Sequence, residues 1–261
     1  MLILKLFQQL YFDFSSIPQE AKNFSGFYFS NILKLIIDKT IKTIGYIWHF
    51  IFRNKKYDNK LVIIGNYKIL PNNLSKNSII YSCGIAENTT FDDAISKKFD
   101  CDVFMFDPTK ESKKFMDTNI NPKLKFFNIG IWKFDGNIKF YSDTDNINLS
   151  VTNLFHTKTY KVLPCKSIAT LMKEHKQNII DVLKMDIEGA SFEILNDLLN
   201  KNIYPKQIVV ELERPFFIYN ASFFELISYL NKRRKLLNRL KRLGYDLVEI
   251  KANELLAIKI N

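Results

Sequence analysis

The chain lacks several features that mark particular classes of protein. It has three cysteines, an odd number without a C-x-x-C pair, which fits reduced thiols in a cytoplasmic protein better than a disulfide framework. That pattern does not support a Cys/His metal site either, and we expect no metal. No G-x-G-x-x-G sequence occurs, which disfavours a nicotinamide-dependent oxidoreductase.

Arginine is scarce as well. The formal net charge of +11 would by itself suggest nucleic acid or anionic lipid, but only six of the 38 basic residues are arginines. Lysine is the poorer residue for reading bases and binding phosphates, so we discount the charge and expect no nucleic-acid partner. The basic run Lys232–Lys235 is read as a solvated helix face, with an anionic partner as the alternative.

The amino-terminal part has neither a secretion signal nor a long enough apolar run. Met1–Leu10 mixes polar residues into its apolar ones, and charged residues interrupt the apolar stretch Ile32–Phe52 before the roughly 20 residues of a membrane span are reached. Helical spacing from Ile37 to Ile51 predicts an amphipathic helix. It packs on the main domain or on a second subunit, as in a homo-oligomer, or it makes peripheral membrane contact. We expect a helical extension over residues 1–58 and a second domain over residues 59–261.

What the chain does contain is an apolar run that ends on acidic residues. In Asp181–Leu195 (DVLKMDIEGASFEIL) a strand pattern stops at Asp186, Glu188 and a glycine, and a helical pattern follows. Two earlier segments have the same form: Ile79–Asn88 opens into a glycine turn, and Val103–Pro108 ends on an acid. Because ligands bind outside the carboxyl ends of strands in open α/β sheets, the three segments predict a nucleotide-type pocket.

From Leu61 onward short apolar runs alternate with helical patterns, which predicts parallel strands joined by crossover helices. The expected strands lie near residues 79–82, 102–106, 123–127, 181–186, 207–211, 246–251 and 255–260. The expected helices lie near residues 89–98, 112–119, 167–175, 191–200 and 222–243. Asp135-Gly136 is typical of a hairpin turn within residues 131–141. The end of the chain predicts an antiparallel hairpin added to the parallel sheet.

These segments resemble the FkbM-type family of class I S-adenosylmethionine-dependent methyltransferases. The resemblance runs from about Ser78 to the carboxyl terminus and depends on YSCGIAENTTF, VFMFDP, Asn128–Gly130, DVLKMDIEGASFEIL and VVELE. It implies a Rossmann-like α/β fold with a mostly parallel seven-stranded sheet, helices on both faces and an antiparallel terminal strand. It also implies S-adenosyl-L-methionine as the cofactor.

The residues expected at the cofactor follow from the strand ends. Gly84 would bring backbone amides to the carboxypropyl end of the cofactor, where a β-carbon would block the approach. Asp107 has the spacing of an acid that accepts from ribose hydroxyls, although a helix cap or Asp-Pro turn is the alternative. Glu87 would replace the acid that usually precedes the glycine. The full expected set is Ser82, Cys83, Gly84, Glu87, Asp107, Asn128 and Gly130, the last two beside the adenine by resemblance.

Methyl transfer to a hydroxyl needs an aligned acceptor and a group that takes its proton. Asp186 and Glu188 are the candidate catalytic residues, Asp186 as orienting group or base and Glu188 on sugar-like hydroxyls; Glu188 as a helix cap is the alternative. Glu211 and His156 are candidate substrate-binding residues, and Glu213 is a secondary one. We therefore expect an O-methyltransferase acting on a hydroxyl of a saccharide or other small metabolite. The alternative is a non-catalytic binding or assembly module that keeps the fold.

Overall fold

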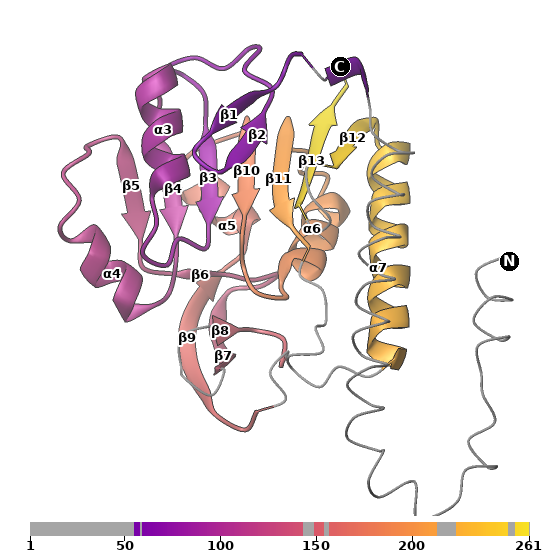
Figure 1. Ribbon diagram of the computed structural model, residues 1–261. Coiled ribbons are helices and arrows are strands. Elements are labelled where there is room, and N and C mark those ends of the chain that lie inside the picture. The colour runs from indigo at the N-terminus through magenta and orange to yellow at the C-terminus, as the bar shows by residue number, and fades with distance from the viewer. Residues whose placement is uncertain are drawn as a thin grey trace, which may run out of the picture. The chain divides into compact units, whose positions relative to one another are not determined.

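The computed structural model describes residues 55–57, 59–142, 149–153, 157–212, 223–249 and 254–260 (Figure 1). Most of the amino-terminal extension lies outside the described residues. Its helix, its membrane or subunit contact and the boundary after residue 58 therefore stay predictions. No helix within the described ranges is both long and apolar enough to cross a membrane.

A seven-stranded sheet forms the centre of the described chain (Figure 1). Its order is β12-β13-β11-β10-β3-β4-β5. The strands are β3 (Ile80–Cys83), β4 (Val103–Phe106), β5 (Leu124–Phe127), β10 (Val182–Met185), β11 (Gln207–Glu211), β12 (Tyr245–Glu249) and β13 (Glu254–Lys259). Pairing is parallel from β11 to β5, whereas β13 pairs antiparallel with both β11 and β12. The predicted strands and the terminal antiparallel hairpin are confirmed.

Alternate residues of each central strand pack into two separate hydrophobic clusters, one on each face of the sheet. On β3, Ile80 belongs to one hydrophobic cluster and Tyr81 to the other. Helices α3 (Thr90–Phe99) and α4 (Lys110–Met116) cover the first face, and helices α5 (Ile168–Glu174), α6 (Ser191–Asn200) and α7 (Phe223–Arg242) cover the second. Because both faces are covered, the central strands read as continuous apolar runs rather than as alternating ones.

A two-stranded hairpin that the sequence analysis missed also packs on the first face. It consists of β1 (Val62–Ile64) and β2 (Tyr67–Ile69), and it follows the short 3-10 helix η2 (Lys55–Tyr57). Ile64 and Ile69 are buried in the same cluster as Phe91 of α3. Gly65 turns the chain with φ +54°, and a Cβ there would lie 2.7 Å from backbone atoms of Phe91. Glycine is therefore required for the hairpin to sit this close to α3.

A second, four-stranded sheet has the order β6-β9-β7-β8 and lies beyond the carboxyl ends of the central strands in Figure 1. Its strands are β6 (Gly130–Ile131), β7 (Gly136–Ser142), β8 (Leu149–Ser150) and β9 (Tyr160–Lys166). The hairpin predicted around Asp135-Gly136 is wrong, because β7 pairs with β9 and not with β6. The Asp135 carboxylate instead accepts hydrogen bonds from Ser167 N and Thr170 Oγ1 at the start of α5, 2.8 and 2.9 Å long.

Candidate active site

Strand register brings five of the predicted site residues into one row. Cys83 of β3 pairs with Phe106 of β4 and Met185 of β10, and these rows continue to Phe127 of β5 and Val210 of β11. The residues that follow these five positions therefore share one edge of the sheet: Asn128, Asp107, Gly84, Asp186 and Glu211. This edge is where ligands bind in open α/β sheets.

Gly84 and Asp186 are in direct contact at the centre of this row. Gly84 has φ +78°, and a Cβ at this position would lie 1.8 Å from the backbone oxygen of Asp186. The amide of Gly84 donates to Phe106 O at 3.0 Å, and the amide of Asp186 donates to Cys83 O at 3.0 Å. Only glycine fits between two strand ends that approach this closely.

Asp107 ties the glycine turn to the next strand. Its Oδ2 atom accepts from the amides of Ile85 and Ala86 at 3.0 and 3.1 Å, and its Oδ1 atom accepts from Thr109 N and Oγ1 at 2.9 and 2.6 Å. The carboxylate is buried. The bonds from Thr109 match the turn that was one alternative for Asp107, whereas the cap of α4 is Thr109 itself. The role of Asp107 at the ribose stays a prediction. Ala86 has φ +49°, a conformation that non-glycine residues rarely adopt and that concentrates at functional sites.

Asn128 and Gly130 extend the row beyond β5. The Asn128 amide donates to the backbone oxygens of Asp107 and Thr109 at 2.9 and 2.8 Å, so it holds the end of β5 against the end of β4. A Cβ on Gly130 would lie 2.7 Å from Cys165 Sγ and 3.0 Å from Phe140, which explains a glycine here without a ligand. The adenine contact of both residues stays a prediction.

The other residues expected at the cofactor differ in exposure. Ser82 and Cys83 are fully buried under the turn, and burial raises the pKa of the Cys83 thiol to about 12. Their side chains lie in the interior, so the turn would contact a cofactor through its own backbone atoms. Glu87 is exposed at the rim of the turn, in reach of solvent and ligands.

Tyr67 is a site residue that the sequence analysis did not find. Its hydroxyl donates to Asp186 Oδ2 at 2.7 Å, from the β1–β2 hairpin to the end of β10. Gly65-Asn66 between the short runs Val62–Ile64 and Tyr67–Ile69 is a recognised signal for such a two-residue turn. Nothing local indicates which carboxylate the tyrosine reaches.

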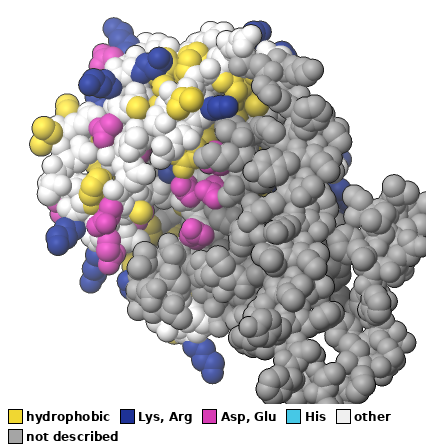
Figure 2. All heavy atoms as spheres, in the orientation of Figure 1, with side chains coloured by type: hydrophobic (Ala, Val, Ile, Leu, Met, Phe, Trp, Pro, Cys, Tyr) yellow, Lys and Arg dark blue, Asp and Glu magenta, His cyan; other side chains and the backbone are white. Residues whose placement is uncertain are grey.

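Glu188 and Glu211 both lie near Asp186. Ser150 of β8 donates to the backbone oxygen of Glu188 at 2.6 Å, which joins the small sheet to this edge. In the antiparallel register of β11 and β13, Glu211 lies opposite Glu254. His156 and Glu213 lie outside the described residues. Acidic side chains gather near the middle of the face shown in Figure 2, the region where Figure 1 places the carboxyl ends of β10 and β11.

Two buried side chains of opposite charge, Lys184 and Asp92, lie under the glycine turn. Lys184 of β10 is 4% exposed, and its Nζ atom donates to Gly84 O at 2.7 Å and lies 5.5 Å from the centre of the Tyr67 ring. Asp92 of α3 is 1% exposed; burial raises its pKa above the ordinary value, and the charge of Lys184 opposes this rise. The sequence signal for this feature was a single lysine inside an otherwise apolar strand, since buried charges are normally paired.

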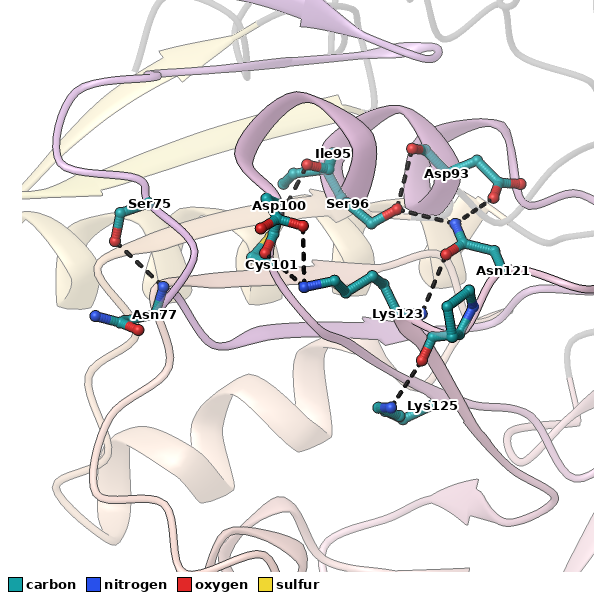
Figure 3. A network of polar contacts seen from close by, with 11 residues as sticks. Ser75, Asn77, Asp93, Ile95, Ser96, Asp100, Cys101, Asn121, Lys123 and Lys125 are labelled. Carbon is teal, nitrogen blue, oxygen red and sulfur yellow. Dashed lines mark hydrogen bonds and ion pairs between the residues drawn. The ribbon is translucent and has the colours of Figure 1, made fainter.

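A second polar network runs along α3, from Asp93 in its first turn to Asp100 at its C-cap, and is separate from this edge (Figure 3). Asn121 donates to Asp93 Oδ1 and Ser96 Oγ at 2.9 and 3.1 Å, and Lys123 pairs with Asp100 at 3.0 Å. The shallow hollow between these residues is closed by bonds among its own side chains. It joins α3 to the start of β5 and has a structural role. No group of three or more His, Cys, Asp or Glu side chains in the described ranges is placed to hold a metal ion.

The strand order, the crossover helices and the antiparallel strand inserted at the sheet edge define a Rossmann-like fold of the class I methyltransferase type. The chain belongs to the methyltransferase FkbM domain family, whose family model matches residues 44–247. The family predicted from the sequence motifs is thereby confirmed, and the protein is a methyltransferase. No curated protein matches the chain.

Solved structures with similar folds include the fibrillarin pre-rRNA processing protein of Methanococcus jannaschii, with a TM-score of 0.39 and 12% identity over 79% of this chain and 84% of that one. Human N-acetylserotonin methyltransferase has a TM-score of 0.33 and 10% identity over 70% of this chain and 48% of that one. A 16S rRNA (adenine(1408)-N(1))-methyltransferase from Catenulisporales acidiphilia has a TM-score of 0.33 and 13% identity over 77% and 98%.

Proposed function

We propose that the chain uses S-adenosyl-L-methionine to methylate a hydroxyl group of a saccharide or other small metabolite. The observation that carries this proposal is the row formed by Gly84, Asp107 and Asp186 at the ends of three adjacent strands. A tight turn, a strand-end acid and a second acid on the next strand form one continuous edge. This is the arrangement that a nucleotide-like cofactor and its acceptor require.

The cofactor would lie over the turn that Gly84 opens. Asp107 fixes the turn through the amides of Ile85 and Ala86, and it would also accept hydrogen bonds from the ribose hydroxyls. Because Ser82 and Cys83 are buried, recognition of the methionine end would depend on the turn's backbone and on the exposed Glu87.

The chemical step is an in-line displacement. The acceptor oxygen forms a bond to the methyl carbon, the bond from that carbon to the sulfonium sulfur breaks, and the hydroxyl proton passes to a base. Asp186 would take this proton, since it lies beside Gly84 at the centre of the row. Glu188 would orient the acceptor from the turn that Ser150 joins to the small sheet.

The acceptor would lie between the strand ends and the four-stranded sheet. In that sheet, Tyr141 of β7 lies opposite Tyr160 of β9, and their rings meet edge to face with centres 6.1 Å apart. Aromatic rings and small polar side chains suit a polyhydroxylated acceptor, which has both apolar faces and hydroxyl groups.

Calorimetric titration with S-adenosyl-L-methionine tests the cofactor. We expect micromolar affinity in the wild type and a loss of at least tenfold in Asp107→Ala. Asp135→Ala is the matched control, because Asp135 also accepts a backbone amide and a threonine hydroxyl, but at the start of α5. Equal affinity in wild type and Asp107→Ala would refute the ribose role, and no binding by the wild type would favour the non-catalytic module.

Turnover is tested separately with methyl-labelled S-adenosyl-L-methionine and a panel of methyl glycosides. Label should appear in a glycoside ether, and Asp186→Asn and Glu188→Gln should lower the rate by about 10²-fold or more for a residue acting as a base. Normal rates in both variants would show that neither carboxylate is catalytic.

A further inference from the structure

We propose that Tyr67 is the positioning residue for the Asp186 carboxylate, so that the β1–β2 hairpin is part of the active site. This inference rests on the proposed function of Asp186 as the base. The observation that carries it is the 2.7 Å hydrogen bond from Tyr67 Oη to Asp186 Oδ2, which joins residues from two separate elements.

The tyrosine is held as a hydrogen-bond donor. Burial raises the pKa of Tyr67 strongly, and the charge and hydrogen bond of Asp186 raise it further, followed by the charges of Glu211 and Glu254. The Nζ atom of Lys184 also lies over this ring, 5.5 Å from its centre. The hydroxyl therefore keeps its proton throughout the pH range in which a carboxylate base works.

The hairpin that carries Tyr67 is fixed by three contacts on different sides. The buried Gln207 side chain of β11 clamps its end, with Leu70 N donating to Oε1 at 2.8 Å and Nε2 donating to Leu70 O at 2.7 Å. The Tyr67 ring meets the Phe91 ring edge to face, with centres 5.5 Å apart. Ile64 and Ile69 anchor the hairpin in the core. The donor is thus preorganised before any ligand binds.

In this arrangement the two carboxylate oxygens of Asp186 have different roles. Tyr67 engages Oδ2, and the described residues place no donor on Oδ1, which leaves that oxygen to accept the acceptor's proton. A hydrogen bond donated to a carboxylate favours its charged form, which is the form that a base needs. Tyr67 touches neither acceptor nor cofactor in this scheme and acts through Asp186 alone.

Tyr67→Phe tests the proposal, since it removes one hydroxyl and keeps the ring. With the methyl glycoside that gives turnover, kcat should fall by about tenfold to a hundredfold, with little change in KM. The affinity for S-adenosyl-L-methionine should stay the same. In the Asp186→Asn background, Tyr67→Phe should have almost no further effect on kcat, because the two residues act as a unit.

Tyr57→Phe is the matched control. Tyr57 Oη also donates to a carboxylate, Asp246 Oδ2 at 2.6 Å, but at the start of β12, away from the row. This variant should lose a similar amount of stability and leave kcat and KM unchanged. A wild-type kcat in Tyr67→Phe would overturn the proposal while the proposed function stood.

A second measurement distinguishes a failure of the Tyr67 proposal from a failure of the proposed function. If the wild type transfers no methyl group, the proposed function fails, and urea unfolding of Tyr67→Phe, Asp186→Asn and the double variant still tests the contact. Non-additive changes in the urea midpoint are expected from a direct bond, and additive changes would overturn the assignment of Tyr67 as the residue that holds Asp186.

Discussion

Gly84 and Asp186 pack so tightly that no β-carbon fits between them: a Cβ on Gly84 would lie 1.8 Å from the Asp186 backbone oxygen. Gly84→Ala should therefore lower the free energy of unfolding by about 2–4 kcal/mol, from the collision and the positive φ together. Urea denaturation measures this. Gly244→Ala has the same φ of +78°, but its nearest neighbour is the flexible Lys259 Nζ at 3.1 Å, so it should lose only about 1–2 kcal/mol. Equal losses would show that the contact with Asp186 has no energetic weight.

Lys184 and Asp92 should be coupled. Lys184→Met removes the hydrogen bond to Gly84 O and leaves the buried Asp92 without its opposing charge, which should cost about 3–5 kcal/mol. Adding Asp92→Asn should recover part of this loss, because the buried charge is then gone. A double variant as unstable as the sum of the single variants would contradict the pairing.

The same pair predicts a pH dependence. Burial places the folded-state pKa of Asp92 above its unfolded value, so the stability that Asp92 contributes is present below the unfolded value and is lost as pH rises through the folded value. Removing Lys184 raises the folded-state pKa of Asp92 further. The loss in Lys184→Met should therefore be smaller in mildly acidic than in mildly alkaline buffer, and urea unfolding at both conditions checks the sign.

The clamp between Gln207 and Leu70 should hold the β1–β2 hairpin. Gln207→Leu removes both hydrogen bonds to the Leu70 backbone and should cost about 1–3 kcal/mol, since the partner groups are left unpaired. Amide exchange in β2 should become faster than exchange in β10. Unchanged exchange at Tyr67–Ile69 would mean that the hydrophobic anchors suffice without the clamp.

His175 should make stability fall in acid. Its ring packs against Phe104 and Phe127, with centres 5.1 and 4.6 Å apart, and burial lowers its pKa below the ordinary value. As pH falls, His175 is therefore protonated in the unfolded chain before it is protonated in the folded chain. The stability that the neutral His175 contributes is present above pH about 6.5 and is lost as pH falls toward the folded-state pKa. His175→Phe should reduce the slope of unfolding free energy against pH in this window. An identical slope in both proteins would rule out His175 as its source.

The central sheet could be predicted because its strands carry a local signal. Apolar runs such as Val182–Met185 and Gln207–Glu211 are buried on both faces, and they end at the residues where the pattern breaks. The row of site residues follows from the same pattern, because parallel strands place their carboxyl ends at one edge. The Asp135-Gly136 hairpin failed because a turn signal cannot say which strand pairs with β7, and β9 competes with β6 for it.

The functions of individual polar side chains were harder to predict. Asp107 has the position of a ribose acid, yet four donors from its own chain occupy it. Tyr67 carries no signal of its own, because a tyrosine in a short strand is ordinary core material. Its partner Asp186 lies far along the chain, and only packing of the hairpin against α3 and β11 brings the two together.

By itself, then, the amino-acid sequence determined the strands of the central sheet, the helices and the family, since hydrophobic periodicity and the acidic-glycine block are local and are read within one element. The tertiary structure alone decided the surroundings of each carboxylate: Asp107 and Asp92 are buried, whereas Asp186 is partly exposed and is held by a tyrosine from another element. The physical reason is that the state of a carboxylate depends on the donors and charges that surround it in space, and most of these come from distant parts of the chain.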